Sequence, residues 1–294
     1  MASPATPSAA AMRSAEESKR CDDAPENSAH DAVDEPIKAA ALLQRRLLQT
    51  RRCLQLALAM AFFGTGLIFL LWYTGGGCAL ARHGRRRDYT ELRISYMLCC
   101  PSIYVVGVVG YAGGALLALV ALALHDREVS AAATAALGRT CSGCCWRTTR
   151  DGRCFCSLSA GATALAFAYV ALVGLALLAV FPVRPCSQRM APGRGWPHAL
   201  GSLLFFFSGD GLLGTLLFAC DDEGAYGFMR GAVAFKVASL VALVASLAAA
   251  FAGAPGLASQ GLAVLTIWLA ALAFERELAR GGGILLRKQP VSDV

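Results

Sequence analysis

The two residues best suited to chemistry lie in one apolar stretch of the chain, 198–219. His198 stands at the edge of this stretch, and Asp210 follows twelve positions later. On a helix, twelve residues make about 3.3 turns, so the two side chains project within about 120° of each other. An imidazole and a carboxyl group that border one groove could transfer a proton or orient a polar headgroup. His198 and Asp210 are therefore the candidate catalytic residues.

Both residues also have a purely structural interpretation. A lone carboxyl group at membrane depth costs roughly a few kcal/mol, so we expect Asp210 to face other helices and to be neutral or paired. There it would act as a hydrogen-bonded clamp near Ser208 or Thr215. His198, next to Trp196, would then be an ordinary polar anchor at the membrane boundary.

Basic residues open the next apolar stretch, 231–252. We expect Arg230 and Lys236 to contact lipid headgroups, with the Lys236 side chain snorkelling to the interface. The alternative for Lys236 is an ion pair with a carboxylate. Glu275 and Arg276 follow the last apolar stretch and are expected to form a solvated helix end.

Two groups of cysteines lie in the linkers. Cys78, Cys99 and Cys100 flank a long basic linker, and a disulfide from Cys78 to one of the other two would connect the first two helices at one end. Palmitoylation, a tetrahedral zinc site and no special role all remain open for the five cysteines of the 125–157 linker. The second pair is Cys-x-Cys and no His lies between, which favours palmitoylation over zinc. These five are Cys141, Cys144, Cys145, Cys154 and Cys156.

Six apolar stretches must position all these residues: 53–73, 103–124, 158–183, 198–219, 231–252 and 256–274. Each has about the twenty residues that cross about 30 Å of hydrocarbon as a helix. A helix also satisfies its own backbone hydrogen bonds in lipid. The predicted fold is therefore all-α, a polytopic membrane protein with a bundle of six transmembrane helices.

The rest of the chain gives the domain organisation and the topology. We predict a disordered tail over 1–44, the transmembrane domain over 45–280 and a second tail over 281–294. Residues 39–52 are expected to form an Arg-rich helix at the membrane interface or a positive stop before the first span. No secretory signal peptide precedes that span, so it would act as its own insertion signal.

The distribution of charged residues indicates which partners the protein has and how it lies in the membrane. The net charge is +7, but the Lys and Arg residues lie mostly in linkers, which favours anionic lipids over nucleic acid as partners. More of them flank the membrane side shared by both termini than the opposite side, despite the cluster at 85–87. The positive-inside rule therefore predicts that both termini are cytoplasmic.

Motifs of soluble enzymes are not found. The sequence has no phosphate-binding glycine loop, no His-Glu-x-x-His and no Gly-x-Ser-x-Gly. We therefore predict no cofactor, and the sequence leaves open whether the protein is an enzyme.

Four features together resemble one known family. They are the CCPSI segment at 99–103, the cysteine-rich segment 141–156, His198 before an aromatic run, and the basic pair Arg230 and Lys236. In this order the chain resembles, over about residues 45–280, the six-span family of post-GPI attachment to proteins factor 2 and the damage-regulated autophagy modulators. It differs at Tyr104, where the family has Ser, at Asp210, near the family's second His, and in 261–274, which lacks the family's Asn and His.

The resemblance implies a protein of the endoplasmic reticulum or Golgi that acts in lipid remodelling of GPI anchors, a process that restores a saturated acyl chain to a lyso-intermediate. It implies membrane lipids as partners, together with GPI-anchored proteins or a partner membrane protein. A second hypothesis is a non-enzymatic membrane organiser, or a viral-type envelope or trafficking protein. A channel or proton-coupled carrier would rest on Asp210 and Lys236 alone.

Overall fold

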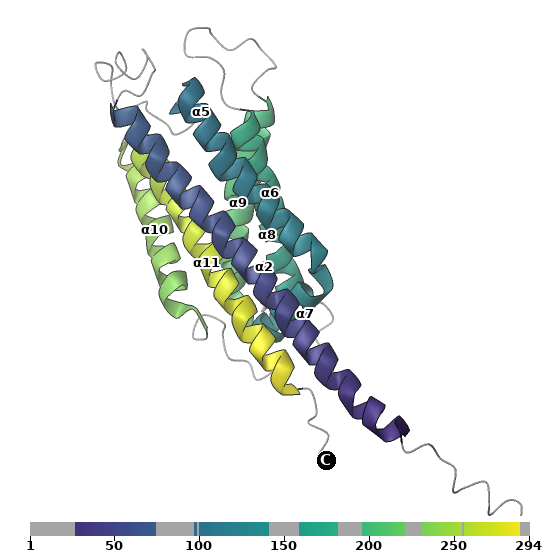
Figure 1. Ribbon diagram of the computed structural model, residues 1–294. Helices are drawn as coiled ribbons and strands as arrows, with labels where there is room; N and C mark the ends of the chain where they lie inside the picture. The colour runs from purple at the N-terminus through teal and green to yellow at the C-terminus, as the bar shows by residue number, and fades with distance from the viewer. Residues whose placement is uncertain are drawn as a thin grey trace, which may run out of the picture. The chain divides into compact units, whose positions relative to one another are not determined.

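Six helices long and apolar enough to cross a membrane make up the core of the computed structural model (Figure 1). The structure describes residues 27–74, 97–98, 100–140, 159–181, 196–220, 231–254 and 256–288. By internal contacts the chain divides into a unit of Leu43–Lys288 and a second unit of Met1–Leu42 with Gln289–Val294. The larger unit carries the bundle, and the predicted all-α, multi-pass membrane fold is confirmed.

The described elements follow one another up and down the bundle. The first span belongs to α2 (Asn27–Thr74), and the second is a continuous run of α5 (Pro101–Gly107), the π-helix η2 (Val108–Gly113) and α6 (Gly114–Leu124). A short α7 (Asp126–Leu137) precedes α8 (Ala160–Val180), α9 (Trp196–Phe218), α10 (Val233–Phe251) and α11 (Gly256–Lys288). Two short strands, β1 (Arg139–Thr140) and β2 (Ala219–Cys220), pair antiparallel.

Two helices are longer than the sequence suggested. Helix α2 runs without a break from Asn27, so the segment 39–52 continues the first span and does not form a separate interfacial helix. Ala, Leu, Gln and Arg favour helix, and an apolar span that is already helical extends cooperatively into such residues. Helix α11 likewise continues to Lys288, beyond the predicted domain boundary at 280.

Small residues let neighbouring helices approach closely. A methyl group built on Gly174 of α8 would lie 2.5 Å from the backbone nitrogen of Phe205 in α9, and one on Gly201 would lie 2.9 Å from the nitrogen of Leu178. Only glycine fits at these two positions. Such backbone contacts replace the hydrophobic effect, which does not drive helices together in lipid. Residue Gly253, with φ of +68°, makes the tight turn between α10 and α11.

Buried ion pairs connect the helices at the end of the bundle where α8 and α10 begin. The Nζ atom of Lys236 lies 2.6 Å from Oε1 of Glu277, and both side chains are 0% exposed. The second oxygen of Glu277 accepts a hydrogen bond from Nε of Arg280 at 2.8 Å. Arg280 also donates to the backbone carbonyl of Ala136 in α7. Helices α10 and α11 therefore meet at the Glu277 carboxylate, and Arg280 connects this pair to α7.

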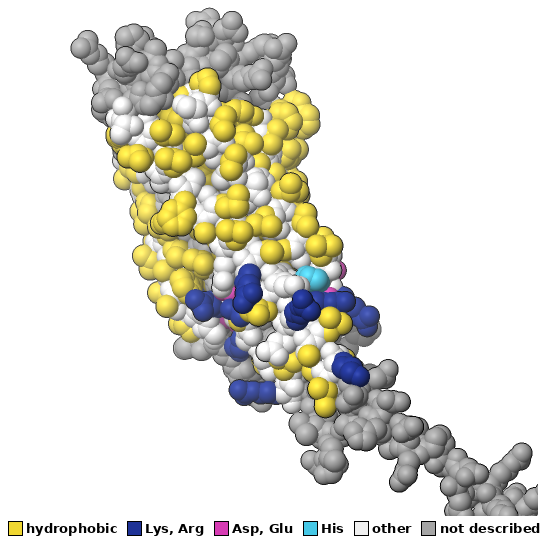
Figure 2. Space-filling model, viewed as in Figure 1, with side chains coloured by type: hydrophobic (Ala, Val, Ile, Leu, Met, Phe, Trp, Pro, Cys, Tyr) yellow, Lys and Arg dark blue, Asp and Glu magenta, His cyan; other side chains and the backbone are white. Residues whose placement is uncertain are grey.

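A second carboxylate of α11 is bound by the first span. Oxygen Oε1 of Glu275, whose side chain is 2% exposed, lies 2.8 Å from Nε of Arg51 and 3.0 Å from Nε2 of Gln55. We refer to Arg51, Lys236, Glu275, Glu277 and Arg280 as the ion-pair layer. In Figure 2, the charged side chains on the visible face gather on its lower part, below a surface that is largely apolar.

The ion-pair layer corrects two expectations. The Lys236 side chain does not snorkel to lipid headgroups, because Glu277 holds it inside the bundle. Glu275 is not a solvated helix end, because the extension of α11 places it beside Arg51 of α2. Nearby, Arg46 donates to Glu128 in α7, and this hydrogen bond lowers the pKa of the Glu128 carboxyl.

Replacing Lys236 with Met tests how much the buried pair stabilises the fold. Glu277 would keep Arg280 as a partner but lose the shorter of its two ion pairs. Removing one member of a buried pair typically costs about 3–5 kcal/mol. We expect a loss of this size in the free energy of unfolding, measured on the purified protein in detergent.

The matched control is Arg276→Met. The Arg276 side chain is 56% exposed and lies 3.6 Å from Glu275, so its loss should cost about 0–1 kcal/mol. Equal stability of the two variants would contradict the structural role assigned to Lys236.

Candidate functional site

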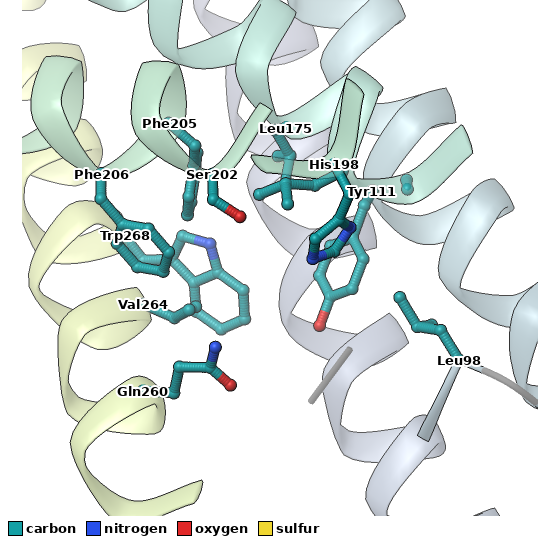
Figure 3. A pocket seen from close by; sticks show the side chains of 12 residues that line it. Leu98, Tyr111, Leu175, His198, Ser202, Phe205, Phe206, Gln260, Val264 and Trp268 are labelled. Carbon is teal, nitrogen blue, oxygen red and sulfur yellow. The ribbon is translucent and has the colours of Figure 1, made fainter. Parts of the chain in front are cut away.

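A cavity of about 70 Å³ lies at the other end of the bundle, among the beginnings of α9 and α11, the end of α8 and the π-helix η2 (Figure 3). Its wall is mainly apolar, with Leu175, Phe205, Val264 and Trp268 among the residues that line it. The volume accessible to a single water is about 10–15 Å³, so the cavity has room for several atoms of a ligand. We call it the polar cavity because of the four polar side chains in its wall.

These four side chains come from three elements. His198 and Ser202 lie one turn apart on α9, Gln260 lies on α11, and Tyr111 lies in η2. Figure 3 shows the Ser202 hydroxyl and the Gln260 amide directed toward the open space next to Trp268. The polar groups thus converge on one small volume within an apolar wall.

The hydrogen bond of His198 fixes what its ring offers. Nδ1 of His198 lies 2.9 Å from the carbonyl oxygen of Phe181 at the end of α8. A carbonyl only accepts, so Nδ1 carries the hydrogen, and Nε2 of the neutral ring is then a hydrogen-bond acceptor. His198 is therefore oriented to accept a hydrogen bond from a ligand hydroxyl or amide.

The π-helix places Tyr111 in the wall of the cavity. Its hydroxyl shares a hydrogen bond with Thr65 of α2, which fixes the ring in place. A π-turn inserts an extra residue into a helix and changes the direction of the side chains around it, and such turns are frequent at functional sites. The sequence pattern gave no sign of this turn.

A second cavity of about 90 Å³ continues the first toward the ion-pair layer. The two cavities share Leu175, Phe205 and Trp268 as lining residues. The second is lined by apolar side chains and one glycine, including Ala118, Ala168, Leu212 and Phe274. We call it the apolar chamber.

The cavities follow helix α11 along most of its apolar part. Gln260 lines the polar cavity and Phe274, fourteen positions later on α11, lines the apolar chamber, so the two cavities together extend over about 21 Å of this helix. The residue that follows Phe274 is Glu275 of the ion-pair layer. A polar end, an apolar middle and a charged floor therefore succeed one another along the bundle.

Asp210 lies elsewhere and does not share the polar cavity with His198. Asp210 lines neither cavity and is exposed on the outer surface of α9, while its neighbours Ser208 and Gly209 are buried. In the part of the chain that the structure describes, Asp210 makes no hydrogen bond or ion pair. The offset of about 120° on the helix was enough to place it on a different face from His198.

The predicted clamp is not formed either. Thr215 donates its hydroxyl hydrogen to the carbonyl of Gly211 on its own helix, 2.8 Å away, and not to Asp210. Residue Ser208 is buried against the bundle, on the side of α9 away from the Asp210 carboxyl.

The structure describes only one of the cysteines for which a disulfide, palmitoylation or a metal was predicted. Cys100 is buried and disulfide-bonded. The other two disulfide candidates, Cys78 and Cys99, lie outside the described residues, as do Arg230 and all five cysteines of the palmitoylation or metal group. Among the described residues, no group of three or more His, Cys, Asp or Glu could hold a metal ion.

Of the four polar residues in the cavity wall, only His198 was predicted from the sequence; Ser202, Gln260 and Tyr111 were not. Signals for two of them were present. Ser202 follows His198 by one helical turn, and Gln260 is an amide within an apolar span, where polar groups are costly and tend to be functional. Nothing in the sequence could have shown that η2 directs Tyr111 to the same place.

The residues of the polar cavity determine the chemistry that fits it. Among the described residues that line it there is no Lys, Arg, Asp or Glu, so it suits an uncharged hydroxyl, ester or amide rather than a phosphate. Among the described residues, His198 bonds the Phe181 carbonyl and no hydrogen bond joins it to Ser202. The geometry supports binding and orientation of a ligand.

Comparisons of the chain with protein-family models, with curated proteins and with solved structures find no match. Its function is therefore inferred from its own residues.

Proposed function

We propose that this multi-pass protein binds a lipid inside its helix bundle and acts in the remodelling of GPI-anchor lipids in the Golgi or endoplasmic reticulum. The observation that carries the proposal is the passage from polar cavity to apolar chamber. A lipid has the same succession of a polar linkage and a hydrocarbon chain. The resemblance of the sequence to the six-span family supplies the class of lipid.

The predicted topology is consistent with this function. The first span enters the bundle at the ion-pair layer, where Arg51 of α2 binds Glu275. With both termini in the cytoplasm, the polar cavity would be on the lumenal side of the membrane, the side that carries GPI anchors. The basic residues at the ion-pair end would then meet the anionic cytoplasmic leaflet.

A cell-based assay tests this proposal. The chain is expressed in cells that lack the cognate remodelling factor, and the acyl composition of the GPI anchors and the surface level of GPI-anchored proteins are measured. We expect wild type to restore both. His198→Ala should reduce the restoration about tenfold or more, because a hydroxyl or amide N–H of the lipid loses an oriented acceptor.

Asp210→Asn is the matched control on the same helix, because Asp210 lies outside the cavities. It should restore the anchors as wild type does, at equal expression and localisation. Unchanged anchor lipids with wild-type protein would contradict the proposed function, and full activity of His198→Ala would contradict the assignment of the cavity.

The exposed face of α9 favours a second candidate function, that of a membrane organiser. Leu203, Phe207, Asp210 and Gly214 recur at spacings of three and four residues, and the first three are exposed. A methyl group built on Gly214 would meet nothing within 4 Å. A carboxyl in hydrocarbon costs roughly a few kcal/mol, and a hydrogen bond to a helix of another membrane protein would offset that cost.

Photo-crosslinking tests the second candidate. A photoreactive amino acid at Phe207, which is 69% exposed, should yield a discrete crosslinked species in membranes. Asp210→Leu should reduce its yield about tenfold, whereas Asp210→Asn, which can still hydrogen-bond, should retain it. The control position is Val241 on α10, 62% exposed. The same pattern from Val241, or no effect of Asp210→Leu, would argue against an assembly face on α9.

A further inference from the structure

We infer that the apolar chamber holds one acyl chain, with its terminal methyl toward the ion-pair layer and its uncharged linkage in the polar cavity. The inference rests on the proposed function only for the source of the lipid. The chemical class of the ligand, a single hydrocarbon chain with an ester, amide or hydroxyl at one end, follows from the two cavities themselves.

The width of the chamber accommodates a single chain. It has a volume of about 90 Å³ and is lined by residues of α2, α6, α8, α9 and α11. Most of the side chains around it are buried, including Ala118, Ala168 and Leu212. Seven of the lining residues are alanines, whose small side chains leave the space. A second chain or a fused-ring lipid would require the helices to separate.

The orientation follows from the cost of burying polar atoms. No polar side chain lines the chamber apart from the indole of Trp268, which stands at its boundary with the polar cavity. An ester or amide in the chamber would lose its hydrogen bonds, at a cost of several kcal/mol in purely apolar surroundings. In the polar cavity, the Ser202 hydroxyl can donate a hydrogen bond to the carbonyl of that group, and Nε2 of His198 can accept one from a hydroxyl or an amide N–H of the ligand.

The ion-pair layer sets the maximum length of the chain. Phe274 and Leu54 line the chamber, and the residues that follow them, Glu275 and Gln55, are hydrogen-bonded to each other. Arg51 binds the same carboxylate one turn away. A longer chain would have to break these buried interactions. The chamber should therefore discriminate among chains by length.

A binding series tests the inference on the purified full-length protein in detergent. The probes are monoacylglycerols of increasing chain length, which carry an uncharged ester and hydroxyls. Affinity should rise about fourfold per added methylene, which corresponds to about 0.8 kcal/mol per buried CH₂, and should stop rising at one length.

Ala168→Leu partly fills the chamber near the ion-pair layer and should shift this limit to shorter chains. Ala166→Leu is the matched control, because Ala166 lies two residues away on the outer surface of α8. It should leave the limit unchanged. Should Ala168→Leu fail to fold, Ala118→Val on α6 provides the same test from another wall.

Photolabelling then gives the orientation. A monoacylglycerol with a diazirine at the end of its chain should label peptides around Phe274 or Leu212, and one with the diazirine next to the ester should label peptides around His198 or Gln260. Labels confined to exposed residues such as Val241, or a length dependence identical in Ala168→Leu and Ala166→Leu, would overturn the inference. If the purified protein behaves as expected while GPI anchors in cells are unchanged, the chamber stands and the proposed function fails.

Discussion

The arrangement of the bundle depends on the neutralisation of buried charge at one end. Glu277 and Lys236 are both fully buried, and their ion pair offsets the cost of removing each charge from water. Because they lie on adjacent helices, their ion pair fixes the register of α10 against α11, while Arg51 and Glu275 fix α2 against the same helix. This layer also closes the apolar chamber, so the interaction that holds the helices in register also bounds the candidate ligand site.

The apolar spans were predictable because hydrophobicity alone determines them. Twenty apolar residues must cross the membrane as a helix whatever their neighbours, so the sequence indicated the number and approximate positions of the described spans. Whether each polar side chain points into the bundle or toward lipid was not predictable in this way. Lys236 and Asp210 have similar settings in the sequence, yet Lys236 is buried and paired while Asp210 is exposed. The orientation of a polar side chain depends on how the helices pack, and a single sequence indicates this packing only weakly.

In the candidate site, too, the sequence predicted one polar residue, while the grouping of the others depends on tertiary packing. His198 could be identified as a polar residue in an apolar span, but its role depends on Phe181, which ends a different helix. The contribution of Tyr111 depends on the π-turn in the second span, and the chamber depends on alanines of four helices that happen to face one another. Each is a property of tertiary packing. Polar residues in spans therefore mark candidates, and only the three-dimensional arrangement groups them into sites.

The backbone contact between α8 and α9 restricts how the molecule can deform. At Gly174 and Gly201 no side chain separates the two helices, so they cannot move closer together and cannot tilt there without a clash. This pair should behave as a stiff mechanical unit. A conformational change that admits a ligand would then occur on the opposite wall, where α2 and α11 meet through side chains that can change rotamer.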